Sequence, residues 1–192
     1  MSSHFYAYLS RMKLIKRWSL MRNTQDENLQ EHSAQVAQLA HALAVIGNRL
    51  YGQNTDAGQV VLQALYHDVG EVIIGDLPTP VKHFNPQINQ SYGNIEKIAC
   101  EKLISLLPEP IQGDYRPLFF PENSRELRLV KAADKIAAHA KCLEEGMLGN
   151  RDFAVAEQAT RRAVEAYYDL PEVVYFMEHC MASFSLAIDE LD

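Results

Sequence analysis

The sequence has few cysteines and no long apolar run. Its three cysteines, Cys100, Cys142 and Cys180, are odd in number and far apart. That distribution matches neither a disulfide framework nor a zinc motif, so reduced structural thiols are expected. No stretch approaches the roughly 18 apolar residues of a membrane span, and the first residues lack the apolar centre of a signal peptide. The sequence therefore predicts a soluble, cytoplasmic protein that does not contact a membrane.

Basic charge is also scarce. The chain has 18 Lys and Arg residues against 25 Asp and Glu residues, which gives a formal net charge of −7. Binding to a nucleic-acid polymer requires a basic stripe along the phosphate backbone, so such a polymer is not an expected partner. A small phosphorylated ligand would need a local cation or a bound metal.

The spacing of apolar residues favours helices throughout, and no sustained strand alternation, internal repeat or low-complexity tract is present. The segment 75–86 carries three prolines and cannot be helical throughout, and the proline-containing segment 108–124 is expected to be a loop. With 192 residues, 47% of them hydrophobic, the chain can bury a sizeable core, so we predict one all-α domain over residues 1–192. The helices are expected at residues 4–15, 28 to about 47–52, 55–69, 86–107, 123–147, 151–167 and 171–191.

Polar side chains interrupt three of these apolar helix faces. His32, Asp68 and Asp134 each lie at helical spacing from apolar residues, which places them on inward faces. A lone histidine there is usually a hydrogen-bonded core residue, but a buried carboxylate is costly unless it is paired or binds a metal. His67 is turned about 100° from Asp68 and can share an ion with it only where another helix crosses. Together the four residues predict one metal site built from three helices.

The chemistry of this set fits a divalent ion. Two neutral imidazoles and two carboxylates leave no residual charge around it, and mixed nitrogen and oxygen ligands suit Co, Mn, Zn, Fe or Ni, with Mg also open. Coordination positions left for water and a substrate oxygen would allow metal-assisted hydrolysis. Glu71, three residues after Asp68, is then a spare carboxylate that can transfer a proton.

An early His, an adjacent His-Asp pair and a distant Asp resemble the pattern of the HD-domain metal-dependent phosphohydrolases. A His-Asp pair alone is weak evidence, but its order, spacing and helical context strengthen it. Longer stretches resemble the bacterial HD-domain 5'-deoxynucleotidases over nearly the whole chain, most densely before residue 100. These stretches are HFYAYLSRMKLIKRWSLMRN, EHSAQVAQLAHALA, YHDVGEVIIGDLPTPVKHFN and LVKAADKIAAHAKCLEE. The resemblance implies an HD-domain helical bundle, a homodimer, and a hydrolase of nucleotide metabolism that removes the 5'-phosphate of 2'-deoxyribonucleoside monophosphates.

The resemblance also implies a role for each matching residue. The metal ligands would be His32, His67, Asp68 and Asp134, and His32 and Asp68 would also contact the substrate. Arg17 would hold the phosphate during catalysis, Trp18 would lie against the sugar, Glu71 would be catalytic, and Asp76, Leu77, Pro78 and Thr79 would cover the nucleoside. From the residues alone, Arg17 reads as a solvated charge and Trp18 as a core residue. The loop reads equally well as an ordinary proline-rich turn and as a rigid substrate contact. His41, His83 and His139 are left out of the predicted site.

Two alternatives remain open at this point. Another HD-type nucleotide phosphohydrolase (a diphosphatase, a triphosphohydrolase or a cyclic-nucleotide phosphodiesterase) would use the same metal ligands. A triphosphate would call for several more basic residues than the two clearly near the site, Arg17 and Lys82. A non-catalytic nucleotide-binding HD protein is the other alternative, and it should have lost a metal ligand or Glu71.

Overall fold

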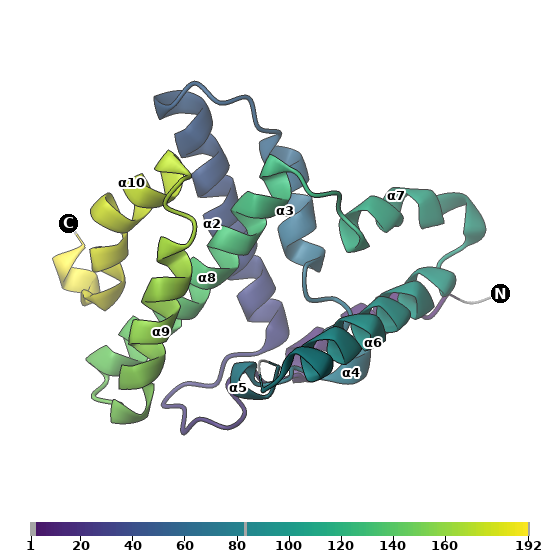
Figure 1. Cartoon of the computed structure of the whole chain (residues 1–192), viewed down its shortest axis with the longest axis horizontal. Coiled ribbons are helices and arrows are strands. Elements are labelled where there is room, and N and C mark those ends of the chain that lie inside the picture. The colour runs from purple at the N-terminus through teal and green to yellow at the C-terminus, as the bar shows by residue number, and fades with distance from the viewer. Residues whose placement is uncertain (1–2, 83, 192) are drawn as a thin grey trace.

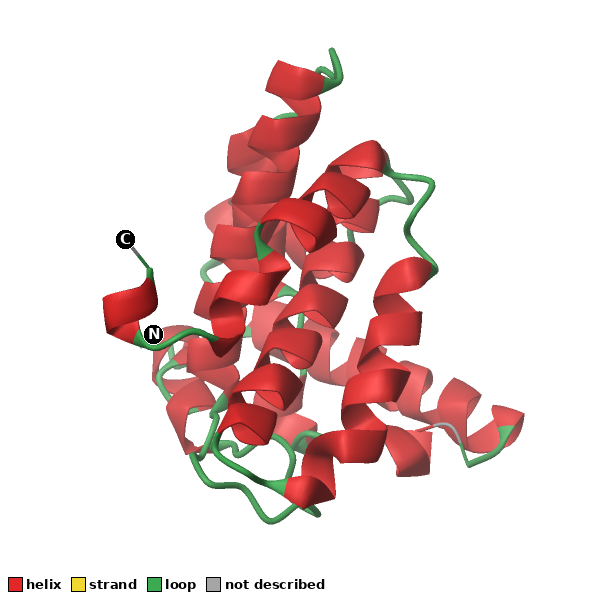
Figure 2. Cartoon of the chain, turned by 90° about the vertical axis from the view of Figure 1, so that its left-hand side faces the viewer, coloured by secondary structure: helices red, strands yellow, loops and turns green. Residues whose placement is uncertain are grey.

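The structure, a computed structural model, describes residues 3–82 and 84–191, apart from the side chains of Thr79 and Pro80. Within this part of the chain every regular element is a helix (Figure 2). The one extended pairing there is an isolated antiparallel bridge between Lys16 and Asn28. The all-α prediction is therefore confirmed. No helix in the described residues is long and apolar enough to cross a lipid bilayer.

The helices follow one another along the chain, mostly with short connections, apart from the long segment 15–28 between η1 and α2 (Figure 1). In order they are α1 (Phe5–Leu9), the 3-10 helix η1 (Met12–Leu14), α2 (Leu29–Leu50), α3 (Ala57–Tyr66), α4 (Glu71–Ile74), α5 (Thr79–Lys82), α6 (Pro86–Ser105), α7 (Glu109–Phe119), α8 (Arg125–Met147), η2 (Arg151–Phe153), α9 (Ala154–Glu165), α10 (Pro171–His179), η3 (Met181–Ser185) and η4 (Ile188–Glu190).

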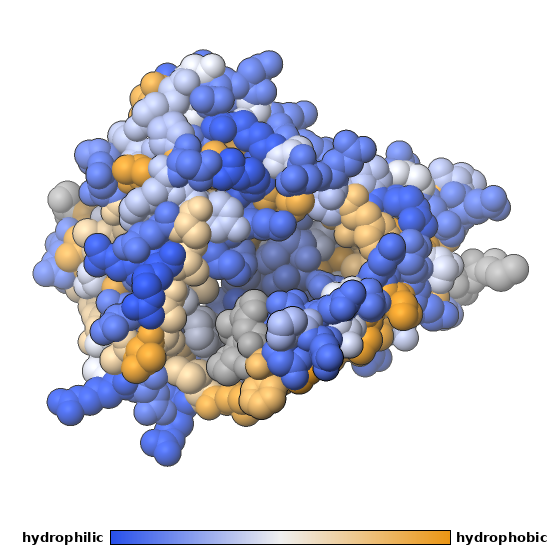
Figure 3. Space-filling view, viewed as in Figure 1, coloured by the Kyte–Doolittle hydropathy of each residue, from blue (hydrophilic) through white to orange (hydrophobic). Residues whose placement is uncertain are grey.

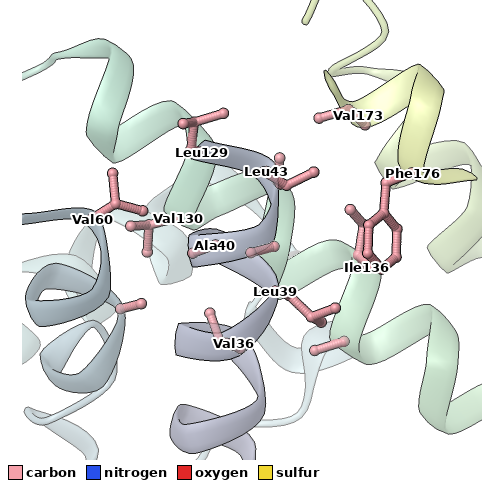
Figure 4. Packing of buried hydrophobic residues seen from close by; sticks show 14 of the residues in the cluster. Val36, Leu39, Ala40, Leu43, Val60, Leu129, Val130, Ile136, Val173 and Phe176 are labelled. Carbon is pink, nitrogen blue, oxygen red and sulfur yellow. The ribbon is translucent and has the colours of Figure 1, made fainter. Parts of the chain in front are cut away.

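The main core lies between α2, α3 and α8, with α9 and α10 packed on the outside (Figure 1). Figure 4 shows its side chains meeting from four helices, among them Leu43 of α2, Val60 of α3, Ile136 of α8 and Phe176 of α10. All three of the aliphatic residues named are fully buried. Because α2, α3 and α8 carry the four predicted metal ligands or lead into them, this core fixes where those side chains meet.

A second apolar cluster joins α1, α6 and α7 beside the end of α3. Phe5 of α1 is fully buried and its ring stacks on Phe119 of α7 at 6.0 Å, while Tyr66 at the end of α3 lies 5.7 Å from the same ring. This cluster corrects the expectation of a loop over 108–124, because residues 109–119 form α7. Pro117 and Gly113 disfavour that helix locally, but packing of its apolar face overrides propensity.

The bounds of α2, α6 and α8 lie close to those expected from the sequence, whereas the first and last helices differ. The Asn28 side chain accepts hydrogen bonds from the backbone N–H groups of Gln30 and Glu31, both at 3.0 Å, and so starts α2 as expected. The helix expected over 4–15 instead breaks into α1 and η1. The helix expected over 171–191 ends at His179 as α10, and the chain beyond it forms 3-10 turns.

Candidate metal centre and substrate site

The structure brings all four predicted metal ligands together. His32 lies in the first turn of α2 and is fully buried, His67 and Asp68 form the turn that follows α3, and Asp134 lies in the middle of α8. One donor atom each from His32, His67 and Asp68 lies within 4.8 Å of the other two, which makes these three a candidate metal site. Asp134 joins the group through His32, since its Oδ1 lies 3.1 Å from His32 Nε2.

A backbone hydrogen bond on the side away from the cluster fixes the orientation of the His67 imidazole. Its Nδ1 donates a hydrogen bond to the backbone oxygen of Ala64 at 2.7 Å, so Nε2 is the nitrogen that faces the cluster. That Nε2 lies 3.0 Å from Asp68 Oδ2, yet it is buried and makes no well-directed hydrogen bond within the described residues. Burial lowers the pKa of His67, but the negative charge of Asp68 outweighs it and raises the pKa to about 9. Metal binding at Nε2 therefore requires the loss of a proton.

The two carboxylates are held ionised in the same small volume. Burial raises the pKa of Asp68, but the neighbouring His67 lowers it further, to well below its usual range. Burial likewise opposes ionisation of Asp134, whose pKa is lowered by its hydrogen bond with His32 and by Lys135, whose Nζ lies 2.8 Å from Asp134 Oδ2. Buried imidazole nitrogens beside ionised carboxylates match the ligand chemistry of a divalent transition metal. The residues present therefore fit such an ion.

Arg17 reaches this cluster from the segment between η1 and α2, and Trp18 follows it in the chain. The guanidinium of Arg17 lies with its Nη1 3.5 Å from Asp68 Oδ2, and its side chain is 12% exposed. Burial lowers the pKa of Arg17, and the charges of Asp68 and Glu27 raise it by more. Trp18 is half-buried, and its ring lies 5.3 Å from that of Phe153. The reading of Arg17 as a solvated charge is therefore wrong.

Glu27 was not singled out by the sequence, although it contacts three predicted site residues. Its Oε2 accepts hydrogen bonds from Arg17 Nε at 3.1 Å and from Trp18 Nε1 at 2.9 Å. Its Oε1 lies 3.6 Å from His32 Nδ1. Burial raises the pKa of Glu27, but the contacts with His32 and Arg17 lower it by more, so the carboxylate is ionised. The only sequence signal was its place directly before the Asn28 cap.

Glu71 lies at the start of α4, and its side chain is 2% exposed. Its Oε1 accepts a hydrogen bond from Lys82 Nζ at 2.9 Å, whereas its buried Oε2 has no hydrogen-bond partner among the described residues. Burial and the nearby charge of Asp68 raise the pKa of Glu71 to about 7, against the opposing effect of Lys82. A carboxyl with this pKa can either give or take a proton at neutral pH. Proton transfer is therefore chemically available at this position.

The loop after α4 brings one of the remaining predicted residues, Asp76, close to Lys82, the hydrogen-bond partner of Glu71. Gly75 has φ +78°, a left-handed conformation that suits glycine, and it turns the chain into Asp76, Leu77 and Pro78. The Asp76 carboxylate lies 3.8 Å from the same Lys82 Nζ that binds Glu71, so the loop and the predicted catalytic residue share one cation. The side chain of Thr79 lies outside the described part of the structure.

Figure 3 shows the molecule hollowed on one face, with hydrophilic residues on the floor. A pocket of about 310 Å³ opens beside His67, Asp68 and Asp134, on the side of α7 and α8. Its other lining residues are Gln63, Leu118, Phe119, Pro121, Leu127, Val130, Lys131, Lys135 and Tyr167. Among the described residues, neither Trp18 nor Asp76 lines it. Leu77 lines a second hollow of about 400 Å³ with α5 and α6.

The excluded histidines lie elsewhere. His41 is exposed on α2, as expected, while His139 is buried with its Nδ1 3.2 Å from the hydroxyl of Thr160. His83 falls outside the described residues. The three cysteines are free thiols, and Cys100 and Cys142 are buried, which confirms their expected structural character.

Comparison with known proteins gives a consistent result. A family model described as YfbR-like 5'-deoxynucleotidase matches residues 4–184. The 5'-deoxynucleotidase YfbR of Escherichia coli O1:K1 is 50% identical over 191 residues, which cover 98% of this chain and 96% of that protein.

Two solved structures share the fold at lower identity. An HD-domain phosphohydrolase from Listeria innocua superposes with a TM-score of 0.84 at 22% identity, over 94% of this chain and 88% of the other. The HD phosphohydrolase of cyanophage S-2L, solved with dA and one catalytic Zn²⁺, has a TM-score of 0.66 at 20% identity, over 93% and 96% of the two chains. At these identities the likeness concerns the fold.

Proposed function

This chain belongs to the YfbR-like 5'-deoxynucleotidases, hydrolases of deoxynucleoside monophosphates, and from that membership we propose how its residues carry out the reaction. One divalent metal ion would bind to His32, His67, Asp68 and Asp134. The observation that carries this proposal is the convergence of these side chains from α2, α8 and the turn after α3, with Arg17 Nη1 3.5 Å from Asp68 Oδ2. We infer that residues 1–192 form one HD-type domain.

The ion would be Co, Mn, Zn, Fe, Ni or Mg, and the donor set suits several of these. When bound, such an ion acidifies a water ligand and polarises a phosphoryl oxygen. The carboxylates of Asp68 and Asp134 are already ionised in its absence, so each needs no deprotonation to bind it. The cyanophage relative was solved with one catalytic Zn²⁺, which supports a single ion here as well.

Arg17 is placed to hold the phosphate next to the metal ligands. Its guanidinium presents a planar fork that matches two phosphate oxygens, a geometry that lysine does not offer. Because Nε is engaged by Glu27 and Nη1 lies close to Asp68, the fork is fixed beside the metal cluster. A phosphate held there would lie against His32 and Asp68, which gives these two residues a substrate contact besides their metal role.

Glu71 is the proposed proton-transferring residue. Its Oε2 is buried without a hydrogen-bond partner in the described part of the chain, and Oε1 is anchored by Lys82. The carboxyl would give a proton to the departing 5'-oxygen or take one from the attacking water. Either transfer requires a pKa near neutrality, which burial provides.

Preference for the deoxy sugar would come from rigid contacts around its 2' position. An apolar wall alone rejects an extra hydroxyl by only about a hundredfold. Trp18 is more than such a wall, because Glu27 holds its indole N–H and Phe153 supports its ring. The segment Asp76, Leu77, Pro78 and Thr79 would cover the nucleoside, with Asp76 as the acceptor for a sugar hydroxyl.

We expect phosphate release from deoxynucleoside monophosphates to exceed release from the matching ribonucleotides, and Trp18→Ala to reduce that ratio at least about tenfold. Trp18→Phe, which keeps an aromatic wall, should retain most of it. The measurement is kcat/KM on paired deoxy and ribo mono-, di-, tri- and cyclic nucleotides. Equal rates on both sugars would contradict the specificity. Faster hydrolysis of the di-, tri- or cyclic nucleotides, measured from the nucleotide product, would favour another HD phosphohydrolase.

We also propose that the chain forms a homodimer. Large apolar side chains are exposed around α5 and α6, where Phe84 is 77% and Ile98 69% exposed, and Figure 3 shows hydrophobic residues gathered along that edge. Light scattering at micromolar concentration should give twice the chain mass of 21.7 kDa. A mass of one chain at every concentration tested would refute the proposal.

A further inference from the structure

Glu27 connects the two halves of the proposed site. On one side its Oε2 accepts hydrogen bonds from Arg17 Nε and Trp18 Nε1, the two residues assigned to the phosphate and the sugar. On the other side its Oε1 faces Nδ1 of His32, a metal ligand, at 3.6 Å. The side chain is only 12% exposed. One largely buried carboxylate thus lies against the three residues proposed to bind the phosphate, the sugar and the metal.

The backbone holds Glu27 in this place. Arg17 N donates to Glu27 O at 2.9 Å, and Leu29 N donates to Ile15 O at 2.9 Å, on either side of the isolated bridge. This short antiparallel pairing sets Arg17 and Trp18 beside Glu27. Trp18 itself has φ 55°, which is unusual for a residue with a side chain and is maintained only where surrounding contacts enforce it.

The same segment is anchored to α8 further along. Glu145 is buried and accepts hydrogen bonds from the backbone N–H groups of Thr24 and Gln25, at 2.9 and 3.2 Å from its two oxygens, and from the side chain of Asn150 at 2.6 Å. Lys141 donates to the backbone oxygen of Gln25 at 2.6 Å. These hydrogen bonds fix residues 18–27 against α8, so the Glu27 side chain cannot swing out into solvent.

His32 needs a partner of this kind. It is fully buried, and its Nδ1 has no hydrogen-bond partner among the residues described, at a contact distance of 3.6 Å from Glu27. Histidines that bind a metal through one nitrogen almost always donate the other N–H to a carboxylate or carbonyl, which fixes the ring and strengthens the ligand. With Nε2 facing Asp134 and Asp68, Glu27 is the carboxylate available to Nδ1.

We propose that Glu27 is a positioning residue that couples metal binding at His32 to the placement of Arg17 and Trp18 for the substrate. This inference rests on the metal site and the substrate contacts proposed above. Two consequences follow from the shared carboxylate. Removing its charge weakens the metal site and loosens the phosphate contact together, and nucleotide and metal strengthen each other's binding because both engage one anchored group.

The test compares Glu27→Gln and Glu27→Asp with Asp26→Asn. Asp26 is the adjacent carboxylate, but its side chain is 64% exposed and pairs with Lys16 at the surface. Removing the charge at Asp26 therefore changes the net charge equally without touching the site. Glu27→Gln keeps the size of the side chain, and Glu27→Asp keeps its charge. Thermal melting shows whether each variant folds, and if one of them does not, the other still tests the proposal.

Metal affinity is measured without substrate, by equilibrium dialysis of the chelator-treated proteins against Mn²⁺ and against Co²⁺. We expect Glu27→Gln to weaken binding about 10- to 100-fold, the usual effect of losing such a partner. Glu27→Asp should recover part of this loss, and Asp26→Asn should match the wild type. Affinity of Glu27→Gln within twofold of the wild type would overturn the coupling to His32.

The substrate side has its own measurement. Trp18 is the single tryptophan of the chain, so the emission of the metal-free protein reports on this residue alone. We expect Glu27→Gln to shift that emission and to raise KM for a deoxynucleotide at least about tenfold, while Asp26→Asn changes neither. Unchanged emission and KM would refute the substrate half of the inference.

These measurements distinguish a failure of the proposed role of Glu27 from a failure of the proposed hydrolysis mechanism. If the wild type bound metal but released no phosphate from deoxynucleotides, the proposed mechanism would fail, while dialysis and fluorescence would still decide the role of Glu27. If the wild type turned over and the Glu27 variants bound metal normally, only the coupling would fail.

Discussion

Glu71→Gln is expected to lower kcat for deoxynucleotide hydrolysis by about 10²- to 10⁴-fold, the range typical of losing a positioned acid or base. Glutamine keeps the shape and can still accept from Lys82, but it cannot transfer a proton. Because no metal ligand changes, the metal content should stay at the wild-type level. Kinetics with a deoxynucleoside monophosphate, together with metal analysis of the same samples, provide the measurement. Glu101→Gln, an exposed carboxylate paired with Arg116, is the control and should be fully active.

The pH profile tells which way the proton moves. If Glu71 gives a proton, kcat falls as pH rises through about 7, because the protonated form is lost. If it takes a proton, kcat falls as pH drops through the same value. In either case the limb belonging to Glu71 should disappear in Glu71→Gln. Unaltered hydrolysis in that variant would refute the assignment and would favour a different proton carrier.

The same substitution should stabilise the metal-free protein at high pH. The folded pKa of Glu71, about 7, lies above its reference value of 4.5, so the native state binds this proton more tightly than the unfolded state does. The free energy of unfolding therefore declines as pH rises from 4.5 to 7, by at most about 3 kcal/mol. Glutamine avoids that loss. Urea unfolding should show Glu71→Gln more stable than the wild type at pH 8 and equal to it at pH 4.

Asp68→Asn is expected to abolish activity, with a loss of at least about 10³-fold, because a bound metal contributes several kcal/mol of charge stabilisation. Asp68 is central to the site, since its Oδ2 lies 3.0 Å from His67 Nε2, 3.8 Å from His32 Nε2 and 3.5 Å from Arg17 Nη1. Asparagine removes the negative charge that lies close to all three of these groups. Metal analysis and phosphate release measure the effect.

The matched control is Asp56→Asn on the same segment of chain. Asp56 caps α3 by accepting from Gln59 N at 3.0 Å, and asparagine caps a helix equally well, so this variant should remain active and bind metal. Full activity and full metal content of Asp68→Asn in the presence of metal would contradict the assignment.

In the wild type, metal affinity should weaken about tenfold per pH unit below pH 9, because His67 must lose its proton before it binds.

The inward positions of His32 and Asp134, two of the proposed metal ligands, were predictable because the signal was local. A polar residue at helical spacing on an apolar face marks a buried polar side chain, and His32 and Asp134 both showed that pattern. The sequence predicted the three helices for the same reason, since their apolar stripes are regular. It could not show that the stripes meet at one point, which depends on how α2, α3 and α8 cross.

Glu27 and α7 show what local patterns miss. Glu27 precedes a helix cap and looks like a solvated charge, and only the antiparallel pairing with Arg17 brings it inside. The sequence of α7 contains Gly113 and Pro117, which argue for a loop, but Phe119 packs on Phe5 and Tyr66 and holds the helix. Contacts between distant segments decide both cases. The pocket beside Lys131 and Lys135 was likewise not foreseen.

A stoichiometric metal titration of the chelator-treated protein, followed by phosphate release from a deoxynucleoside monophosphate, tests the single-metal site most directly. We expect negligible release without metal, a linear rise with added Mn²⁺ or Co²⁺, and a plateau at one ion per chain. Asp68→Asn should show no rise over the same range. Full activity in the metal-free protein, or a plateau that needs two ions per chain, would contradict a single-metal site at His32, His67, Asp68 and Asp134.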